Sequence, residues 1–161
     1  GLPKIAGSLR RLESLHLCGF KSLAPLLDLS DLRGFSRLSW LQLTGTAINN
    51  IRAIGDMKGL TELSISIERD EQLSKLMAAI EQLPKLKRLS LHFETSIRDL
   101  SPLQTAKQVR SLELWGDVLD TSPLHYLTEV KELKLNRFSV GEAQMAAIRK
   151  ALPQCKVKPL Y

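Results

Sequence analysis

Short apolar groups with the spacing L-x-x-L-x-L recur along almost the whole chain. The seven triplets are Leu12, Leu15 and Leu17; Leu38, Leu41 and Leu43; Leu60, Leu63 and Ile65; Leu86, Leu89 and Leu91; Val109, Leu112 and Leu114; Val130, Leu133 and Leu135; and Leu152, Cys155 and Val157. The first residues of consecutive triplets lie 21 to 26 residues apart. A repeat of this length predicts stacked units that bury their apolar side chains against neighbouring units rather than in one globular core.

Within each triplet the second and third apolar residues lie two apart, so both point to the same side of a short strand. The residues between and beside them point to the opposite side. With this spacing and this repeat length, the sequence resembles the leucine-rich-repeat family. The resemblance implies an α/β fold, a leucine-rich-repeat solenoid in the form of a right-handed β/α horseshoe, with about seven parallel strands on its concave face.

The segments that return the chain from one strand to the next are of two kinds. Residues 70–82 show helical spacing and predict a helix with Asp70 as its N-cap. Its buried side is expected to consist of Leu73, Leu76, Met77 and Ile80. The shorter returns contain Pro102 and Pro123 and predict turns or 3₁₀ pieces.

A second helical return is predicted near the end of the chain, where Ser139 and Glu142 match the S-x-x-E capping box. Its buried side is expected to consist of Ala143, Met145, Ala146 and Ile148. The proline-containing returns resemble bacterial leucine-rich repeats, whereas the two helical returns resemble the ribonuclease-inhibitor type. The array is therefore interpreted as mixed.

The outward strand positions define the candidate binding surface, because both tryptophans of the chain fall there. Tryptophan and arginine are enriched among residues that dominate protein interfaces. The alternative is that each indole merely lies across small neighbouring side chains. The residues predicted to contact a partner on this concave face are His16, Trp40, Gln42, Glu62, Arg88, His92, Glu113, Trp115, Lys134 and Asn136.

The charge of the chain is concentrated near its C-terminus. The formal net charge is +6, and residues 130–161 hold seven basic residues against two acidic residues. This end either binds an acidic protein, a phosphate-rich polymer or an anionic surface, or is only the solvated end of the solenoid. The predicted basic patch consists of Lys134, Arg137, Lys156 and Lys158.

No motif for catalysis or for a cofactor emerges from the sequence. His16 and His92 are expected three strands apart, about 14 Å, too far to share a metal ion. Cys18 and Cys155 are expected six strands apart, about 29 Å, too far for a disulfide. Gly55 to Leu60 lacks the spacing of a phosphate-binding loop. We therefore expect no enzyme, no metal and no cofactor.

These observations predict a non-catalytic recognition module that binds another protein through its concave face, with nucleic acid disfavoured by the central acidic residues and no membrane segment. Residues 1–161 are interpreted as one domain, the C-terminal part of a longer protein. The resemblance implies the sensor of a bacterial signalling ATPase or the targeting part of an effector, hence a cytoplasmic location or secretion into a host cell. The alternatives are the substrate-recognition part of a multidomain enzyme and a binder of an anionic polymer through the basic end.

Overall fold

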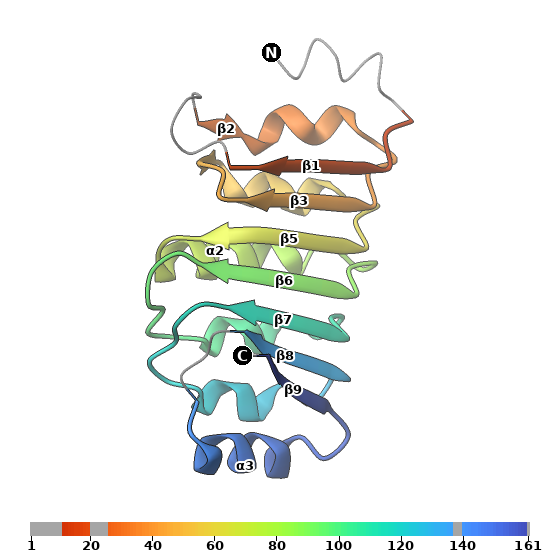
Figure 1. The fold of residues 1–161 in the computed structure, drawn as a ribbon. Coiled ribbons are helices and arrows are strands. Elements are labelled where there is room, and N and C mark those ends of the chain that lie inside the picture. The colour runs from red at the N-terminus through yellow and green to blue at the C-terminus, as the bar shows by residue number, and fades with distance from the viewer. Residues whose placement is uncertain (1–10, 20–25, 137–139, 161) are drawn as a thin grey trace.

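A computed structural model describes residues 11–19, 26–136 and 140–160 of the chain, with the backbone alone at residue 160. Strands alternate with short helices along the chain, where η denotes a 3₁₀ helix (Figure 1). The elements are β1 Ser14–Cys18, β2 Leu27–Asp28, η1 Leu29–Gly34, β3 Trp40–Thr44, β4 Ile48–Asn49, η2 Ile51–Asp56, β5 Glu62–Ile67, α2 Asp70–Ile80, β6 Arg88–Phe93, η3 Ser101–Thr105, β7 Ser111–Trp115, η4 Ser122–Tyr126, β8 Glu132–Asn136, α3 Glu142–Ala151 and β9 Lys156–Leu160.

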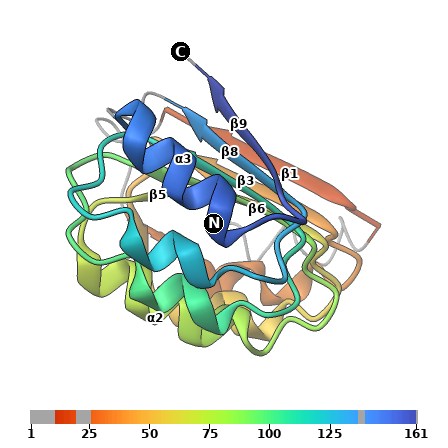
Figure 2. The ribbon, with the colours of Figure 1, turned by 90° about the horizontal axis from the view of Figure 1, so that it is seen from below.

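One parallel sheet carries the repeat. Within the described ranges it has seven strands in the order β1-β3-β5-β6-β7-β8-β9, one from each predicted triplet. The helices pack against one face of this sheet and leave the other face open (Figure 2). We call the uncovered side the open face. The sheet and its helices confirm the predicted α/β leucine-rich-repeat solenoid.

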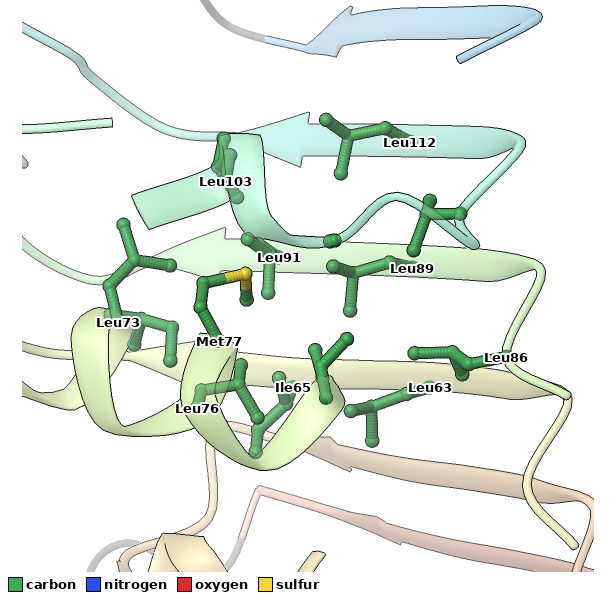
Figure 3. Close-up of a cluster of buried hydrophobic side chains, with 14 of the residues drawn as sticks. Leu63, Ile65, Leu73, Leu76, Met77, Leu86, Leu89, Leu91, Leu103 and Leu112 are labelled. Carbon is green, nitrogen blue, oxygen red and sulfur yellow. The ribbon is translucent and has the colours of Figure 1, made fainter. Parts of the chain in front are cut away.

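The core lies between the sheet and the helices. Leu63 and Ile65 of β5 and Leu89 and Leu91 of β6 point toward α2, whose Leu73, Leu76 and Met77 fill the space between them (Figure 3). All seven side chains are at most 2% exposed. Burial of one leucine side chain contributes roughly 1.5–3 kcal/mol, so this packing explains why the second and third residues of each triplet are apolar.

Each inner strand of the sheet begins with a β-bulge. The N–H groups of Lys87 and Arg88 both donate to the carbonyl oxygen of Thr61, at 2.9 and 3.1 Å. Two residues that oppose one residue of the neighbouring strand define a bulge, and the same sharing recurs at the starts of β3, β5, β7 and β8. The leading residues of these bulges, with Glu13 before them and Lys156 after them, are joined in one stack by backbone hydrogen bonds. We call this stack the bulge row; it consists of Glu13, Ser39, Thr61, Lys87, Arg110, Lys131 and Lys156.

The predicted register is correct for six triplets and wrong for the last. Strand β9 pairs Val157 with Leu133, the position that the triplet pattern assigns to Cys155. One residue lies between Cys155 and Val157, whereas two residues lie between Leu86 and Leu89 in an inner repeat. Within the described residues, only the N–H of Lys156 donates to the carbonyl oxygen of Lys131. The last strand therefore lacks the bulge and is displaced by two residues, which preserves the side to which each residue points.

The helical returns follow the prediction in their position but not at their ends. The predicted core side of α2 is buried, but the helix has Arg69 as its N-cap, and the Asp70 carboxylate accepts a hydrogen bond from the N–H of Arg98 in the next repeat. Asp70 therefore joins two repeats rather than capping its own helix. The prolines open η3 and η4, as predicted.

Helix α3 begins after the predicted capping box. Its N-cap is Gly141, whose N–H donates to the side chain of Gln144 at 3.1 Å, so Gln144 takes the role predicted for Glu142. Ser139 lies outside the described residues. Met145 and Ile148 are buried, as predicted, whereas Ala143 and Ala146 are exposed, so the buried side of α3 is narrower than predicted. No helix in the described ranges has the length and apolar character needed to cross a bilayer.

Candidate functional site

The register of the sheet arranges the open face in rows that run across the strands. Residues paired from strand to strand form a first row near the strand starts, a second row in the middle and a third row near the strand ends. The first row is Ser14, Trp40, Glu62, Arg88, Ser111, Glu132 and Lys156; the second row is His16, Gln42, Ser64, Ser90, Glu113, Lys134 and Lys158; and the described third row includes Cys18, Thr44, Ser66, His92, Trp115 and Asn136. The ten predicted contact residues thus share one face.

Each tryptophan on this face is paired with a histidine. His16 meets Trp40 edge-on, with ring centroids 4.0 Å apart, and His92 stacks on Trp115 at 5.5 Å with the rings 8° from parallel. Trp40 remains 38% exposed, while Trp115 is half-buried. The stacked pair follows directly from the register, because His92 and Trp115 are opposite each other on β6 and β7. The triplet pattern placed both residues on the correct face, but their pairing emerges only from the register of the two strands.

A hollow of about 340 Å³ lies on the open face between Trp40 and the charged residues of β8. Its floor is formed by the small side chains of Ser64, Ser90 and Ser111. The larger side chains of Glu62, Arg88 and Glu113 also line it. A floor of serines between longer residues leaves room for side chains of another molecule, and this feature was missed because single serines carry no motif.

The charged residues around the hollow are paired with one another across neighbouring strands. Arg88 lies 2.9 Å from Glu62, and Lys134 lies 3.6 Å from Glu113. The amide of Asn136 donates to the second oxygen of Glu113 at 3.0 Å. Because ion pairs near the surface contribute little to stability, each charged group can leave its partner and pair with a charge of a bound molecule at a small cost in free energy.

Two of the four residues of the predicted basic patch are paired with carboxylates. Lys158 lies 2.7 Å from Glu132, and its hydrogen bond to that carboxylate is the main cause that lowers the pKa of Glu132. Lys134 is paired with Glu113, Lys156 is exposed, and Arg137 lies outside the described residues. The open face therefore holds both signs of charge near its C-terminal strands rather than a field of one sign.

His92 is the most perturbed base of this face. Its Nε2 lies 3.3 Å from both the Ser64 and the Ser90 hydroxyl oxygens. Burial lowers the pKa of His92, against the opposing effect of Glu113 and Glu94, so the ring is neutral at pH 7. A serine beside a neutral histidine resembles part of a catalytic triad, but a triad also needs an acid that orients the other ring nitrogen. Within the described chain no hydrogen bond to that nitrogen of His92 is formed.

The two cysteines differ in their environments. Cys18 is exposed and accepts a hydrogen bond from the Thr44 hydroxyl at 3.2 Å, while burial raises the pKa of the Cys155 thiol. Across the described ranges, no three His, Cys, Asp or Glu side chains lie close enough together to hold a metal ion. The described side chains of the open face offer aromatic stacking, hydrogen bonds and charges of both signs.

A parallel sheet with one strand per repeat, a bulge at the strand starts and 3₁₀ or helical returns on a single face defines the leucine-rich-repeat fold. No protein-family model matches the chain, and no curated protein matches it in sequence. Its fold is nevertheless shared with solved bacterial proteins of this class.

An internalin from Listeria monocytogenes is similar in structure, with a TM-score of 0.62 and 22% sequence identity over 96% of this chain and 43% of that chain. A leucine-rich-repeat protein from Leptospira interrogans gives a TM-score of 0.59 and 20% identity over 93% of this chain and 38% of that chain. The chain thus spans less than half the length of either protein, and the likeness concerns the fold.

Proposed function

We propose that this chain is a non-catalytic recognition module that binds a protein partner in the hollow of the open face. The observation that carries the proposal is the combination of a serine floor with a partly exposed indole at one end, since Trp40 is 38% exposed. A solvent-facing tryptophan beside a recess is typical of residues that dominate protein interfaces. The ion pairs of the hollow supply charges of both signs for orienting the partner.

The roles of the individual side chains follow from their positions. Trp40 and Trp115 provide apolar contact area, with His16 and His92 supporting their rings. Arg88, Glu62, Glu113 and Lys134 provide charges that set the orientation of the partner. Gln42 provides an amide on the second row, whereas the amide of Asn136, which is 2% exposed, holds the carboxylate of Glu113. Within a longer bacterial protein, such a module would serve as a sensor or a targeting domain.

Selection from a random peptide display library against the folded chain tests this proposal even while the natural partner is unidentified. Independently selected binders should converge on the open face, and Trp40→Ala should weaken them by about 2 kcal/mol or more. Ser90→Tyr should block them by filling the floor of the hollow. The matched control is Ser74→Tyr on the exposed side of α2, which should leave binding unchanged. Binders that tolerate both open-face substitutions would contradict the proposal.

A further inference from the structure

The bulge row changes character along the solenoid axis. Its first three residues are Glu13, Ser39 and Thr61, whereas the next four are all cationic. The backbone hydrogen bonds that join Lys87, Arg110, Lys131 and Lys156 measure 2.7 to 2.9 Å. Four consecutive repeats therefore present one cation each along the edge where the strands begin, which lies on the right in Figure 1. We call these four residues the basic rim.

Most of the basic rim is exposed and is not neutralised. Lys87, Lys131 and Lys156 are exposed, and within the described residues none of the three takes part in an ion pair. Arg110 is paired with Glu129 at 3.3 Å, and its side chain is 41% exposed. The rim therefore differs from the open face, where Lys134 and Lys158 are held by carboxylates.

The rim is also linear. Lys87 reaches along it to the carbonyl oxygen of Gln108 at 3.5 Å, and Arg110 reaches to the carbonyl oxygen of Glu129 at 3.3 Å. With one cation per strand, four cations span three strand spacings, about 14 Å. An extended polypeptide covers that distance with roughly four to five residues at about 3.3 Å each.

We propose that the basic rim binds an extended acidic peptide segment, a run of about five Asp and Glu residues that lies across the starts of β6 to β9. Three of its four cations are lysines, which are compact point charges on flexible stems and adapt to carboxylates at varied spacing. The site adjoins the hollow, because Lys87 and Arg110 directly precede Arg88 and Ser111 of the first row. Lys156 belongs to both the rim and the first row, but none of the four rim residues lines the hollow, so binding at the rim does not depend on the function proposed for the hollow.

Other polyanions fit the rim less well. Proteins that bind single-stranded nucleic acid combine a basic groove with aromatic side chains on which bases stack, and the bulge row contains no aromatic residue. Surfaces that bind anionic membranes combine cations with apolar side chains that enter the headgroup region. The rim is a single line of charge at a sheet edge, which matches a linear ligand rather than a plane.

The probe for this site is a fluorescein-labelled oligoglutamate peptide of about six residues, long enough to span the rim, with binding followed by fluorescence anisotropy at several salt concentrations. Wild-type affinity should fall as salt screens the exposed charges. The triple variant Lys87→Gln, Lys131→Gln, Lys156→Gln should bind roughly tenfold or more weakly, since exposed charge pairs are individually weak but act together here. Glu129→Gln, which frees Arg110, should bind more tightly than wild type, and a misfolded protein would not show such a gain.

The control is a second triple variant, which loses the same net charge at exposed residues on the helical returns: Arg52→Gln, Arg149→Gln, Lys150→Gln. Equal losses in the two triple variants would overturn the proposal, because only net charge would then matter. Tighter rim-dependent binding of double-stranded DNA, or of vesicles containing anionic lipid, would also overturn it. Ser90→Tyr should leave oligoglutamate binding unchanged, so failure at the rim and failure of the hollow are distinguishable.

Discussion

The turn that follows β7 offers a sharp test of the packing between neighbouring repeats. Gly116 has φ +108°, and a Cβ built on it would lie 2.5 Å from the carbonyl oxygen of Phe93 in the adjacent strand. Gly45 follows β3 in the equivalent place with φ +62°, but its nearest contact would be an ordinary 3.5 Å. Alanine substitution at the two glycines therefore separates the cost of a left-handed backbone from the cost of the steric overlap.

The left-handed conformation costs an L-residue about 1–2 kcal/mol. The loss of chain entropy in the unfolded state offsets about 0.4–1 kcal/mol of this cost. Gly45→Ala should therefore lower the free energy of unfolding by about 1 kcal/mol. At Gly116 the backbone lies further from the allowed region, and the carbonyl of Phe93 must also move, so Gly116→Ala should cost about 3 kcal/mol or more.

Urea unfolding followed by circular dichroism measures the difference. With a slope of about 2 kcal/mol per molar urea, a difference of about 2 kcal/mol separates the two midpoints by about 1 M. The native fluorescence should also change in Gly116→Ala alone, because Trp115 precedes this turn and stacks on His92. Coincident midpoints for the two variants would show that the close approach of β6 and β7 at Phe93 is not a constraint on the fold.

Three further predictions concern the site and the core. Burial lowers the pKa of His92 from 6.5, so below pH 6.5 the folded state binds fewer protons than the unfolded state. The free energy of unfolding should therefore decrease as the pH falls through the lowered pKa. Thermal melts of the His92→Gln variant at several pH values should show a smaller decrease. Iodoacetamide near pH 8 should alkylate the exposed Cys18 faster than Cys155, whose pKa is raised by burial; mass spectrometry of tryptic peptides measures both rates, and faster reaction at Cys155 would contradict the burial described. Leu91→Ala, at a side chain with 0% exposure, should cost about 2–5 kcal/mol in urea unfolding; a loss below about 1 kcal/mol would contradict the packing of β6 against α2.

The sequence predicted those features of the fold that repeat. Six triplets specify both the strand register and the side to which each residue points, because a period of two links spacing directly to orientation. The last triplet failed because one residue is missing before Val157, and an apolar pattern does not distinguish a strand position from the turn position that Cys155 occupies. The predicted cap of α2 failed because a side-chain oxygen can bond to another repeat, as Asp70 does with the N–H of Arg98. The predicted box of α3 failed because Gln144, rather than Glu142, bonds to the residue at the N-cap.

The site was predictable as a surface but not as a set of contacts. The sequence pattern placed Trp40, Trp115 and the charged residues on one face, yet which charges neutralise one another depends on side-chain reach across strands. The basic rim was overlooked for a different reason. Lys87, Arg110 and Lys131 sit between the first and second apolar residues of their triplets, where a regular strand has no place for them, and only the bulge brings them into line with Lys156 at the start of β9. In the fourth, fifth and sixth triplets that position holds three cations in succession, whereas Lys156 follows Cys155 and joins them only through the register of β9.

The electrostatic difference between the open face and the rim assigns them different tasks. The cations that line the hollow are compensated, as Arg88 is by Glu62, so the hollow offers little long-range attraction, and discrimination there depends on the fit of side chains. The rim carries Lys87, Lys131 and Lys156 uncompensated among the described residues, and unpaired exposed charges raise association rates more than they raise affinity. A partner with an acidic stretch beside its binding segment would thus be captured by the rim and selected by the hollow. At the starts of β6, β7 and β8 the bulge places one rim residue beside one first-row residue, so the same backbone device holds the two surfaces in register.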